Sequence, residues 1–427
     1  MNFRGLMALG LVVCGPLIAR AATTETVIHS FNSPKVGYGP EAKLLIGRVG
    51  TLYGTTSYGY GHVTFGSVFS LTPRPKGGGY GVTLLHEFLG QKASDGASPV
   101  AAVAMDPSGA LYGTTLKGGS KNNGIIFQLT PPSQGGDVWT ETILYNFDSN
   151  SIGGGSPEGA LVRDPRGNFY GTTSGGNAHG AGGVFKLSPP SNGQTTWQYS
   201  VLYAFQNTPD GWAPQSALVQ DDAGALYGTT TYGGMVCTPP GQTKMSCGTI
   251  FKLTPPARGQ MTWTETVLYR FTGAADGFGP VATLLMGANG VLYGTTAGVA
   301  GDEVGTVFSL SPPQQGQTEW NYALLHTFSG TPDGFEPLGR LAFDVSGNLV
   351  GTTKSGGLNG YGTVFAMTPP VQGQSDWTES ILWSFSGSAD GGAPAAGLAV
   401  DSSGNLFGSA SQGGAFNEGA LFEISGY

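Results

Sequence analysis

The stretch Leu161-Val-Arg-Asp-Pro-Arg-Gly-Asn-Phe-Tyr-Gly-Thr-Thr173 decides the fold, because its apolar pattern and its turn occur seven times along the chain. The position of Tyr170 is filled, at steps of 57 to 66 residues, by Tyr53, Tyr112, Tyr170, Tyr227, Tyr293, Val350 and Phe407. A near-constant period of this length is typical of repeat architectures. The sequence therefore predicts one small structural unit that is repeated seven times.

Each copy is expected to form a β-hairpin, with one apolar run before the turn Pro165-Arg-Gly-Asn168 and one after it. An Asp carboxylate accepts hydrogen bonds from the backbone of such a turn, and Gly adopts the positive φ that other residues resist. We therefore interpret the Asp beside each turn as one repeated structural residue and not as a catalytic group. These residues are Asp106, Asp164, Asp222, Asp344 and Asp401.

Two further elements recur seven times each, and Glu265-Thr-Val-Leu-Tyr-Arg-Phe271 and Gly248-Thr-Ile-Phe-Lys-Leu253 represent them. Both are rich in the β-branched and aromatic residues that strands favour. We name the four elements of a unit A (the run before the turn), B (Leu-Tyr-Gly-Thr-Thr), C (Val-Phe-x-Leu and its variants) and D (the run ending in Phe). Seven units of four short antiparallel strands predict an all-β fold, a seven-bladed β-propeller.

The order of the elements indicates how the ring closes. After the first residues comes a lone D element, Glu25–Phe31, and the last unit has A, B and C without D. Pairing the N-terminal strand with the last three strands would complete the seventh blade. We therefore expect residues 22–427 to form a single propeller domain.

Each B element also has a glycine in mid-strand, for example Gly171. Strand interiors avoid glycine unless another backbone comes close. We attribute these glycines to the convergence of the blades on the central axis.

Residues 1–21 have the pattern of a secretory signal peptide. Met1-Asn-Phe-Arg4 is a short basic start, Gly5 to Ile18 is apolar but too short for a comfortable membrane span, and Ala19-Arg-Ala21 resembles a cleavage site. No other segment is apolar for long enough to cross a bilayer. The formal net charge of −8 argues against nucleic acid and against anionic membranes as partners.

Cys237 and Cys247 both lie in the longest repeat. Export to an oxidising compartment favours a disulfide between them. The alternative is a metal or reactive thiol site, which would need nearby His or acidic ligands that this loop lacks.

The repeat resembles the tandem Gly/Val-rich repeat of the GloVer family, in Leu-Tyr-Gly-Thr-Thr, in Gly-Thr-Val-Phe-x-Leu-Thr-Pro-Pro and in Trp-Thr-Glu-Thr-Val-Leu-Tyr-x-Phe. The resemblance covers nearly all of the chain after residue 21. It implies an exported bacterial protein and no particular activity. Family members carry surface anchors, whereas this sequence stops at Tyr427 after its last C element. We therefore expect a secreted or periplasmic protein.

The D–A and B–C connections of a propeller blade lie on one face, and loops on a rigid scaffold commonly carry function. Four D–A loops contain Asp-Gly, followed in three of them by an aromatic residue; an aromatic ring beside a carboxylate suits a sugar. The alternative is that Asp-Gly forms the turn and the aromatic ring wedges between blades. The candidate ligand-binding residues are Asp210, Trp212, Asp276, Phe278, Asp333, Phe335 and Asp390, with His62 and His179, which interrupt the repeat on the same face.

No catalytic residue, metal or cofactor is predicted, because the sequence lacks the common hydrolase, zinc and phosphate-binding motifs. Three of its five histidines, His29, His86 and His326, occupy a strand position that Tyr or Trp fills in other units, so we expect them in the core or between blades.

The first functional hypothesis is a non-enzymatic binding or scaffold module for a carbohydrate or another extracellular polymer. The alternative is a polysaccharide hydrolase or lyase that uses acids of the D–A loops, since glycoside hydrolysis needs only two carboxylates across a pocket. A purely structural surface protein is the third. Catalysis predicts unlike acids or a His in the central funnel, binding predicts an aromatic platform, and a structural role predicts neither. The sequence does not indicate an oligomeric state.

Overall fold

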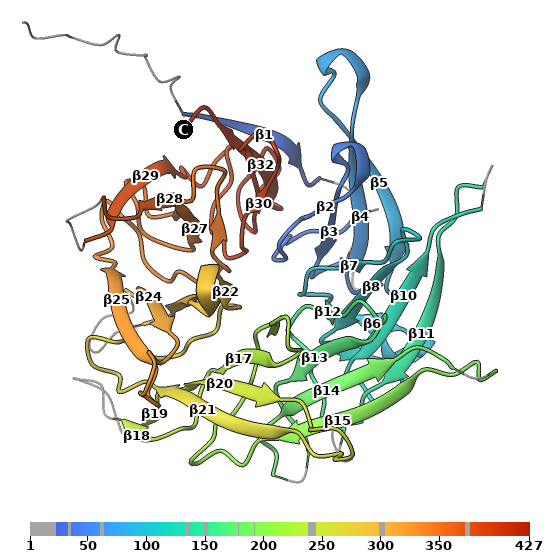
Figure 1. Ribbon diagram of the computed structural model, residues 1–427. Helices are drawn as coiled ribbons and strands as arrows, with labels where there is room; N and C mark the ends of the chain where they lie inside the picture. Colours follow the sequence, from blue (N-terminus) through green and yellow to red (C-terminus); the bar gives the residue numbers. More distant parts are fainter. Residues whose placement is uncertain are drawn as a thin grey trace, which may run out of the picture.

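The computed structural model describes residues 23–32, 36–59, 64–133, 136–148, 153–177, 179–191, 193–237, 245–298, 304–371 and 376–427. The predicted signal peptide and His62 lie outside these residues. Seven four-stranded antiparallel sheets surround a central axis (Figure 1). The predicted seven-bladed propeller is confirmed.

Blades 1 to 3 follow one another along the chain and contain strands A to D in order. Blade 1 consists of β2 (Leu45–Ile46), β3 (Leu52–Thr56), β4 (Ser67–Pro73) and β5 (Tyr80–Glu87). Blade 2 consists of β7 (Ala104–Met105), β8 (Leu111–Thr115), β10 (Ile125–Thr130) and β11 (Thr140–Asn146). Blade 3 consists of β12 (Val162–Arg163), β13 (Phe169–Thr173), β14 (Gly183–Ser188) and β15 (Gln198–Ala204).

Blades 4 to 6 have the same order. Blade 4 consists of β16 (Val219–Gln220), β17 (Leu226–Thr230), β20 (Thr249–Thr254) and β21 (Thr264–Arg270). Blade 5 consists of β22 (Leu285–Met286), β23 (Leu292–Thr296), β24 (Thr306–Ser311) and β25 (Asn321–Thr327). Blade 6 consists of β26 (Ala342–Phe343), β27 (Leu349–Thr353), β28 (Thr363–Thr368) and β29 (Thr378–Ser384).

Blade 7 joins the two ends of the described chain. Its strands are β30 (Ala399–Val400), β31 (Leu406–Ala410), β32 (Ala420–Ser425) and β1 (Thr24–Ser30), and β1 lies against β32 in Figure 1. The two strands pair antiparallel from Thr24 with Ser425 to Ser30 with Ala420. The expected closure of the ring by the N-terminal strand is therefore present.

Small elements lie in the connections between these strands. Two-stranded ribbons are formed by β6 (Gly96–Ala97) with β9 (Lys117–Gly118) and by β18 (Val236–Cys237) with β19 (Met245–Ser246). The short 3₁₀ helices are η1 (Arg48–Gly50), η2 (Pro75–Gly77), η3 (Gln91–Ala93) and η4 (Ala288–Gly290). None of the helices in the described ranges has the length and apolar character that a membrane crossing requires.

The glycine of strand B lies beneath a phenylalanine ring of strand C. Gly171 pairs with Phe185 across the sheet, and a Cβ added to Gly171 would lie 2.5 Å from Cζ of Phe185. The corresponding distance is 2.3 to 2.6 Å in all seven blades. Our attribution of these glycines to an approaching backbone is therefore wrong, because a side chain within the same blade occupies the space.

Neighbouring blades contact one another through a second glycine and a proline. The glycine before each strand C has a positive φ and faces the proline before the next strand A, as Gly182 faces Pro214. A Cβ on it would lie 2.4 to 2.9 Å from a ring carbon of that proline, and the contact between Gly419 and Pro40 closes the ring. Blade spacing therefore depends on the absence of a side chain at this glycine.

Threonines of strand B add hydrogen bonds between blades near the axis. The Thr172 hydroxyl donates to the carbonyl of Ser216 at 2.9 Å, and the Thr352 hydroxyl donates to the carbonyl of Ala396 at 2.9 Å. Ser409 takes the same role between the last and first blades, donating to the carbonyl of Ala42 at 3.2 Å. The Thr-Thr dipeptide of the repeat thus has a structural origin.

The aspartates of the A–B turns are structural, as predicted, except at one position. Asp164 accepts hydrogen bonds from the backbone N–H of Arg166 and of Asn168, both at 2.9 Å, and these bonds lower its pKa. Asp106, Asp344 and Asp401 make equivalent turns. In blade 4 the assignment to Asp222 is wrong, because Asp221 is the residue that accepts from the Ala225 N–H.

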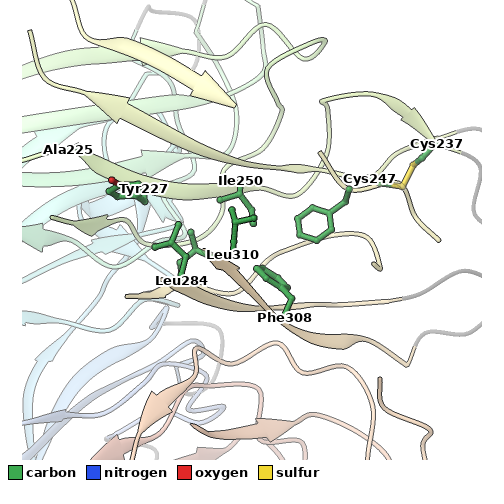
Figure 2. Packing of buried hydrophobic residues seen from close by; sticks show 10 residues of the cluster. Ala225, Tyr227, Cys237, Cys247, Ile250, Leu284, Phe308 and Leu310 are labelled. Carbon is green, nitrogen blue, oxygen red and sulfur yellow. A yellow bond between two sulfur atoms is a disulfide. The ribbon is translucent and has the colours of Figure 1, made fainter. Parts of the chain in front are cut away.

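The hydrophobic core lies between blades. One cluster combines Ile250 and Phe271 of blade 4 with Leu284 and Phe308 of blade 5, all fully buried (Figure 2). The predicted disulfide is confirmed, since Cys237 and Cys247 are joined with their Cα atoms 6.1 Å apart beside this cluster (Figure 2).

We predict that Gly171→Ala destabilises the protein by about 2 kcal/mol, because the added methyl group would overlap the Phe185 ring. Gly175→Ala is the matched control, since a Cβ there meets no atom within 4 Å. Denaturant unfolding of the two variants measures the difference. Equal losses in both variants would contradict this account of the strand B glycine.

Candidate functional site

The D–A and B–C connections of each blade form one face, and backbone pairing makes this face rigid. The residue after Asp-Gly forms a β-bridge with the B–C connection of its own blade, as Trp212 does with Tyr232. The next residue, Ala213, has φ of 55° and donates its N–H to the carbonyl of Ala181 in blade 3 at 3.0 Å. The aromatic position is thereby fixed from two directions.

The aspartates of the D–A loops point into their own loops. Asp210 accepts hydrogen bonds from the Tyr203 hydroxyl at 2.6 Å and from the Gly211 N–H at 2.9 Å. Asp276 accepts from the Tyr269 hydroxyl at 3.0 Å, and Asp333 accepts from the Ser329 N–H at 3.1 Å. These three carboxylates are buried and hold the loop shape. Ligand binding by them stays a prediction.

Asp390 is less deeply buried and has the same kind of partners. Its carboxylate accepts from the Ser386 N–H at 2.9 Å and from the indole N–H of Trp383 at 3.4 Å. The residue that follows Asp390-Gly391 is Gly392, so this loop offers a ligand no ring.

A glutamate of the neighbouring strand D faces the aspartate in four D–A loops, those of Asp95, Asp210, Asp333 and Asp390. Burial raises the pKa of Glu379 to about 7, and the charge of Asp333 adds to the shift. The pKa of Glu265 is raised to about 7 by burial and then by Asp210, and that of Glu25 by burial and then by Asp390. Burial at the contacts between adjacent blades therefore favours the protonated form of these glutamates.

One of these contacts could hold a metal ion. His86 Nε2 lies 3.7 Å from Asp95 Oδ2 and 3.6 Å from Glu141 Oε1. The same three positions recur as His326, Asp333 and Glu379, where His326 is 3.2 Å from Asp333. Because the arrangement repeats as Tyr203, Asp210 and Glu265, with Tyr in place of His, we assign it to the contact between blades, as expected for His86.

The aromatic rings of the D–A loops differ in exposure. Phe278 and Phe335 are half-buried and pack over glycines, since a Cβ on Gly298 would lie 2.6 Å from Phe278 and one on Gly356 would lie 2.8 Å from Phe335. Trp212 is 39% exposed, and its ring centroid is 5.1 Å from that of Tyr232. Among the predicted aromatic residues, Trp212 is the one that offers a ring face to a ligand.

A second exposed pair occupies the same position in blade 1. Tyr38 and Tyr58 are 41% and 50% exposed, and their rings stack with centroids 5.2 Å apart and planes 19° apart. Blades 1 and 4 are three blades apart in a ring of seven, so the two pairs lie on roughly opposite sides of the axis.

A groove between blades 1 and 2, which we call the blade 1–2 groove, adjoins the Tyr38–Tyr58 pair. Phe65 and Ser98 line both a cavity of about 190 Å³ beside the tyrosines and a cavity of about 760 Å³ beside Leu89 and Lys117. Phe65 and Leu89 are exposed there, and the exposed polar side chains of Lys117 and Asn122 stand at the same wall. The groove therefore combines ring faces with hydrogen-bonding groups.

The central channel has a different lining. A cavity of about 230 Å³ is surrounded by the three residues that follow the D–A proline in every blade. Within these lining residues there is neither an aromatic ring nor a histidine. Its charged groups are Glu41, Lys43, Glu158 and Arg340. This lining lacks the aromatic platform that binding in the funnel predicts, and of the acids or histidine that catalysis predicts it contains Glu41 and Glu158.

Of the two histidines that interrupt the repeat, only His179 lies within the described residues. His179 is exposed on the B–C connection of blade 3, which also carries Ala181, the partner of the residue after Trp212. His62 lies outside the described residues.

Sequence analysis missed Tyr38, Tyr58 and Phe65. The Asp-Gly signature hid Tyr38, because blade 1 has Val36 in place of the aspartate. The shorter pattern Gly37-Tyr38-Gly39-Pro40 matches Gly211-Trp212-Ala213-Pro214 and would have found it. Tyr58 and Tyr232 lie two residues after Thr-Thr, a position that has no distinctive pattern in the sequence. Their β-bridges to Tyr38 and Trp212 place them beside the rings of the D–A loops.

Comparison with protein families and structures agrees with this architecture. The model of the Gloeobacter/Verrucomicrobia repeat matches residues 17–239, 137–320 and 236–426. The chain belongs to this repeat family. Comparison with curated proteins gives no match.

Among solved structures, the repeat protein is similar to a putative 6-phosphogluconolactonase from Bacteroides uniformis, with 15% identity, a TM-score of 0.50 and coverage of 80% of this chain and 85% of the other. It is also similar to a hypothetical selenium-binding protein from Sulfolobus tokodaii, with 12% identity, a TM-score of 0.50 and coverage of 92% and 98%. At these identities the likeness shows the fold alone.

We predict that the stability of this repeat protein falls as the pH rises from about 4.5 to about 7. Each of these glutamates has a pKa of about 7 in the folded chain and an ordinary pKa of 4.5, so the folded chain binds the proton more tightly than the unfolded chain. The resulting gain in the free energy of unfolding is complete below pH 4.5 and is lost as the pH rises through 7. Glu379→Gln, which stays neutral, should reduce the fall in melting temperature between about pH 5 and about pH 8. Glu319→Gln, at an exposed site, is the control; an identical pH profile in both variants would contradict the prediction.

Proposed function

We propose that this protein is an exported, non-enzymatic binding module that recognises a carbohydrate polymer on the face formed by its D–A and B–C connections. The observation that carries the proposal is the presence of two exposed aromatic pairs, Tyr38 stacked on Tyr58 and Trp212 tilted against Tyr232, each fixed by a β-bridge. Exposed aromatic rings on a rigid backbone are suited to stacking on the apolar face of a sugar ring.

The blade 1–2 groove supplies the polar groups that such a ligand requires. A sugar stacked on Tyr58 or Phe65 would place its hydroxyls toward Asn122 and Lys117, which line the same groove. The Lys117 ammonium and the Asn122 side-chain NH₂ donate hydrogen bonds to hydroxyl oxygens, while the Asn122 oxygen accepts from the Gly118 N–H. The aromatic pair at Trp212, on the other side of the axis, would serve as a second contact for a long chain, and two linked contacts bind a polymer more tightly than one.

The enzyme hypothesis receives less support from the same face. A glycosidase needs two carboxyl groups on opposite sides of the bond that is cleaved. The D–A aspartates are engaged by their own loops, and the raised glutamates lie half-buried between blades. The ring stacks therefore favour binding over hydrolysis, and export would place the module where polymers of this kind occur.

We predict that the protein binds one or more polysaccharides on a glycan array, and that Tyr58→Ala and Trp212→Ala each weaken binding about tenfold, the loss of roughly 1.4 kcal/mol of stacking. Met261→Ala is the control, because Met261 is an exposed apolar side chain in the C–D connection on the opposite face. Affinity is measured by titration of the retained polymer, and the incubation also tests for released sugar.

Three outcomes are informative. Loss of retention in the two ring variants with no product supports the binding module. Release of sugar would replace it with the hydrolase or lyase. If no polysaccharide is retained, or if Met261→Ala and the ring variants bind with equal affinity, the proposal is contradicted and the rings have only a structural role.

A further inference from the structure

One position at which the central channel departs from the sevenfold repeat is the third residue after the D–A proline. This position carries Lys43 in blade 1 and Arg340 in blade 6, whereas blades 2 to 5 have Ala102, Ala160, Ala217 and Thr283. Blade 7, which stands between blades 6 and 1, has Gly397. Two cations are thus placed on either side of a residue without a side chain.

Gly397 packs directly against the backbone of Arg340. A Cβ on Gly397 would lie 2.6 Å from the carbonyl oxygen of Arg340 and 3.1 Å from its Cβ. Any larger residue would displace Arg340 and fill the space between the two cations. The breaks in blades 1, 6 and 7 therefore belong to one local arrangement.

Neither cation has an anionic partner within the described part of the chain. The ion pairs found there involve His86 and His326, and Nε of Arg340 is buried without a hydrogen-bond partner. Burying charge without compensation is costly, and two like charges add repulsion. Burial, and then the charge of Arg340, lower the pKa of Lys43 to about 8, the direction that this uncompensated pair requires.

The acids of the channel are engaged elsewhere. Glu41 accepts a hydrogen bond from the Ser57 hydroxyl at 2.8 Å, and Glu158 accepts one from the Gln215 side-chain amide at 2.8 Å. Both are the first residue after the D–A proline, whereas Lys43 and Arg340 are the third. Neither forms an ion pair with Lys43 or Arg340 in the described part of the chain.

We propose that Lys43 and Arg340 form an oxyanion-binding site in the central channel, which accepts one carboxylate, sulfate or phosphate group. The guanidinium of Arg and the ammonium of Lys are the groups that proteins use for such anions. A channel cavity of about 230 Å³ admits one such group or a single sugar acid.

The site is independent of the ring stacks but adjoins them. Ser57 and Thr231, which bond to the channel residues Glu41 and Gln215, directly precede Tyr58 and Tyr232. The anion can therefore be a free ion or the acidic group of a sugar bound on the same face. The free ion and the acidic sugar would present the same kind of oxyanion to Lys43 and Arg340, and the experiment below distinguishes between them.

The test is isothermal titration of the full protein with sodium sulfate, sodium phosphate, sodium glucuronate and neutral glucose, in chloride buffer of constant ionic strength. We expect saturable binding of at least one oxyanion and none of glucose at this site. Arg340→Gln and Lys43→Gln should each weaken that binding at least tenfold. Arg258→Gln, which removes an exposed cation in the C–D connection of blade 4, should leave it unchanged.

Thermal unfolding of the same variants guards against a general salt effect, because sulfate stabilises most proteins by exclusion. In chloride alone, Arg340→Gln should raise the melting temperature, since it removes a partly buried charge that has no anionic partner in the described residues. Sulfate should stabilise the parent protein more than this variant.

The outcomes also separate this site from the proposed function. Binding of sulfate or phosphate alone identifies a free-anion site, and binding of glucuronate as well identifies a site for acidic sugars. Tyr58→Ala should keep sulfate binding even if polymer binding fails. No saturable binding of any oxyanion, or equal binding in Arg340→Gln and Arg258→Gln, would overturn the proposal.

Discussion

The contact between the strand C phenylalanine and the strand B glycine is the constraint on which the rest of the structure depends. The ring of Phe185 covers Gly171, and the equivalent pair recurs in every blade, so each blade has a large residue and an empty position directly opposite. This packing fills the interior of the blade without widening its inner edge. Strand B can then approach the axis closely enough for Thr172 to reach the carbonyl of Ser216 in the next blade.

The use of repeated residues for packing and loop structure explains why the candidate sites lie where the repeat is interrupted. Residues that recur in most blades, such as the D–A aspartates, form hydrogen bonds within the loops that shape each unit. A residue is available to a ligand where one blade departs from its neighbours. Tyr58 does so on the face, and Lys43 and Arg340 do so in the channel. The face of the propeller and its axis thus offer two chemically different surfaces side by side.

Sequence analysis predicted the blades, their order and the ring closure, because strand periodicity and the position of the lone D element are local features of the chain. It placed one turn aspartate wrongly, at Asp222 in place of Asp221, because two adjacent acids fit the local pattern and only the register to Tyr227 distinguishes them. Of the predicted aromatic residues it included Trp212, which is exposed, but also Phe278 and Phe335, which pack over glycines. It missed the Tyr38–Tyr58 stack, whose partners are 20 residues apart in the chain and meet through a β-bridge.

The sequence by itself determined the number of blades, the strand order, the disulfide and the membership of the repeat family, since each follows from a pattern that recurs along the chain. The tertiary structure decided which side chains are free to act. Exposure of Trp212, burial of Asp210 and the convergence of Lys43 with Arg340 across blade 7 depend on distances between blades. Those distances are set by side-chain packing, such as that of Phe on Gly, which a linear pattern does not encode.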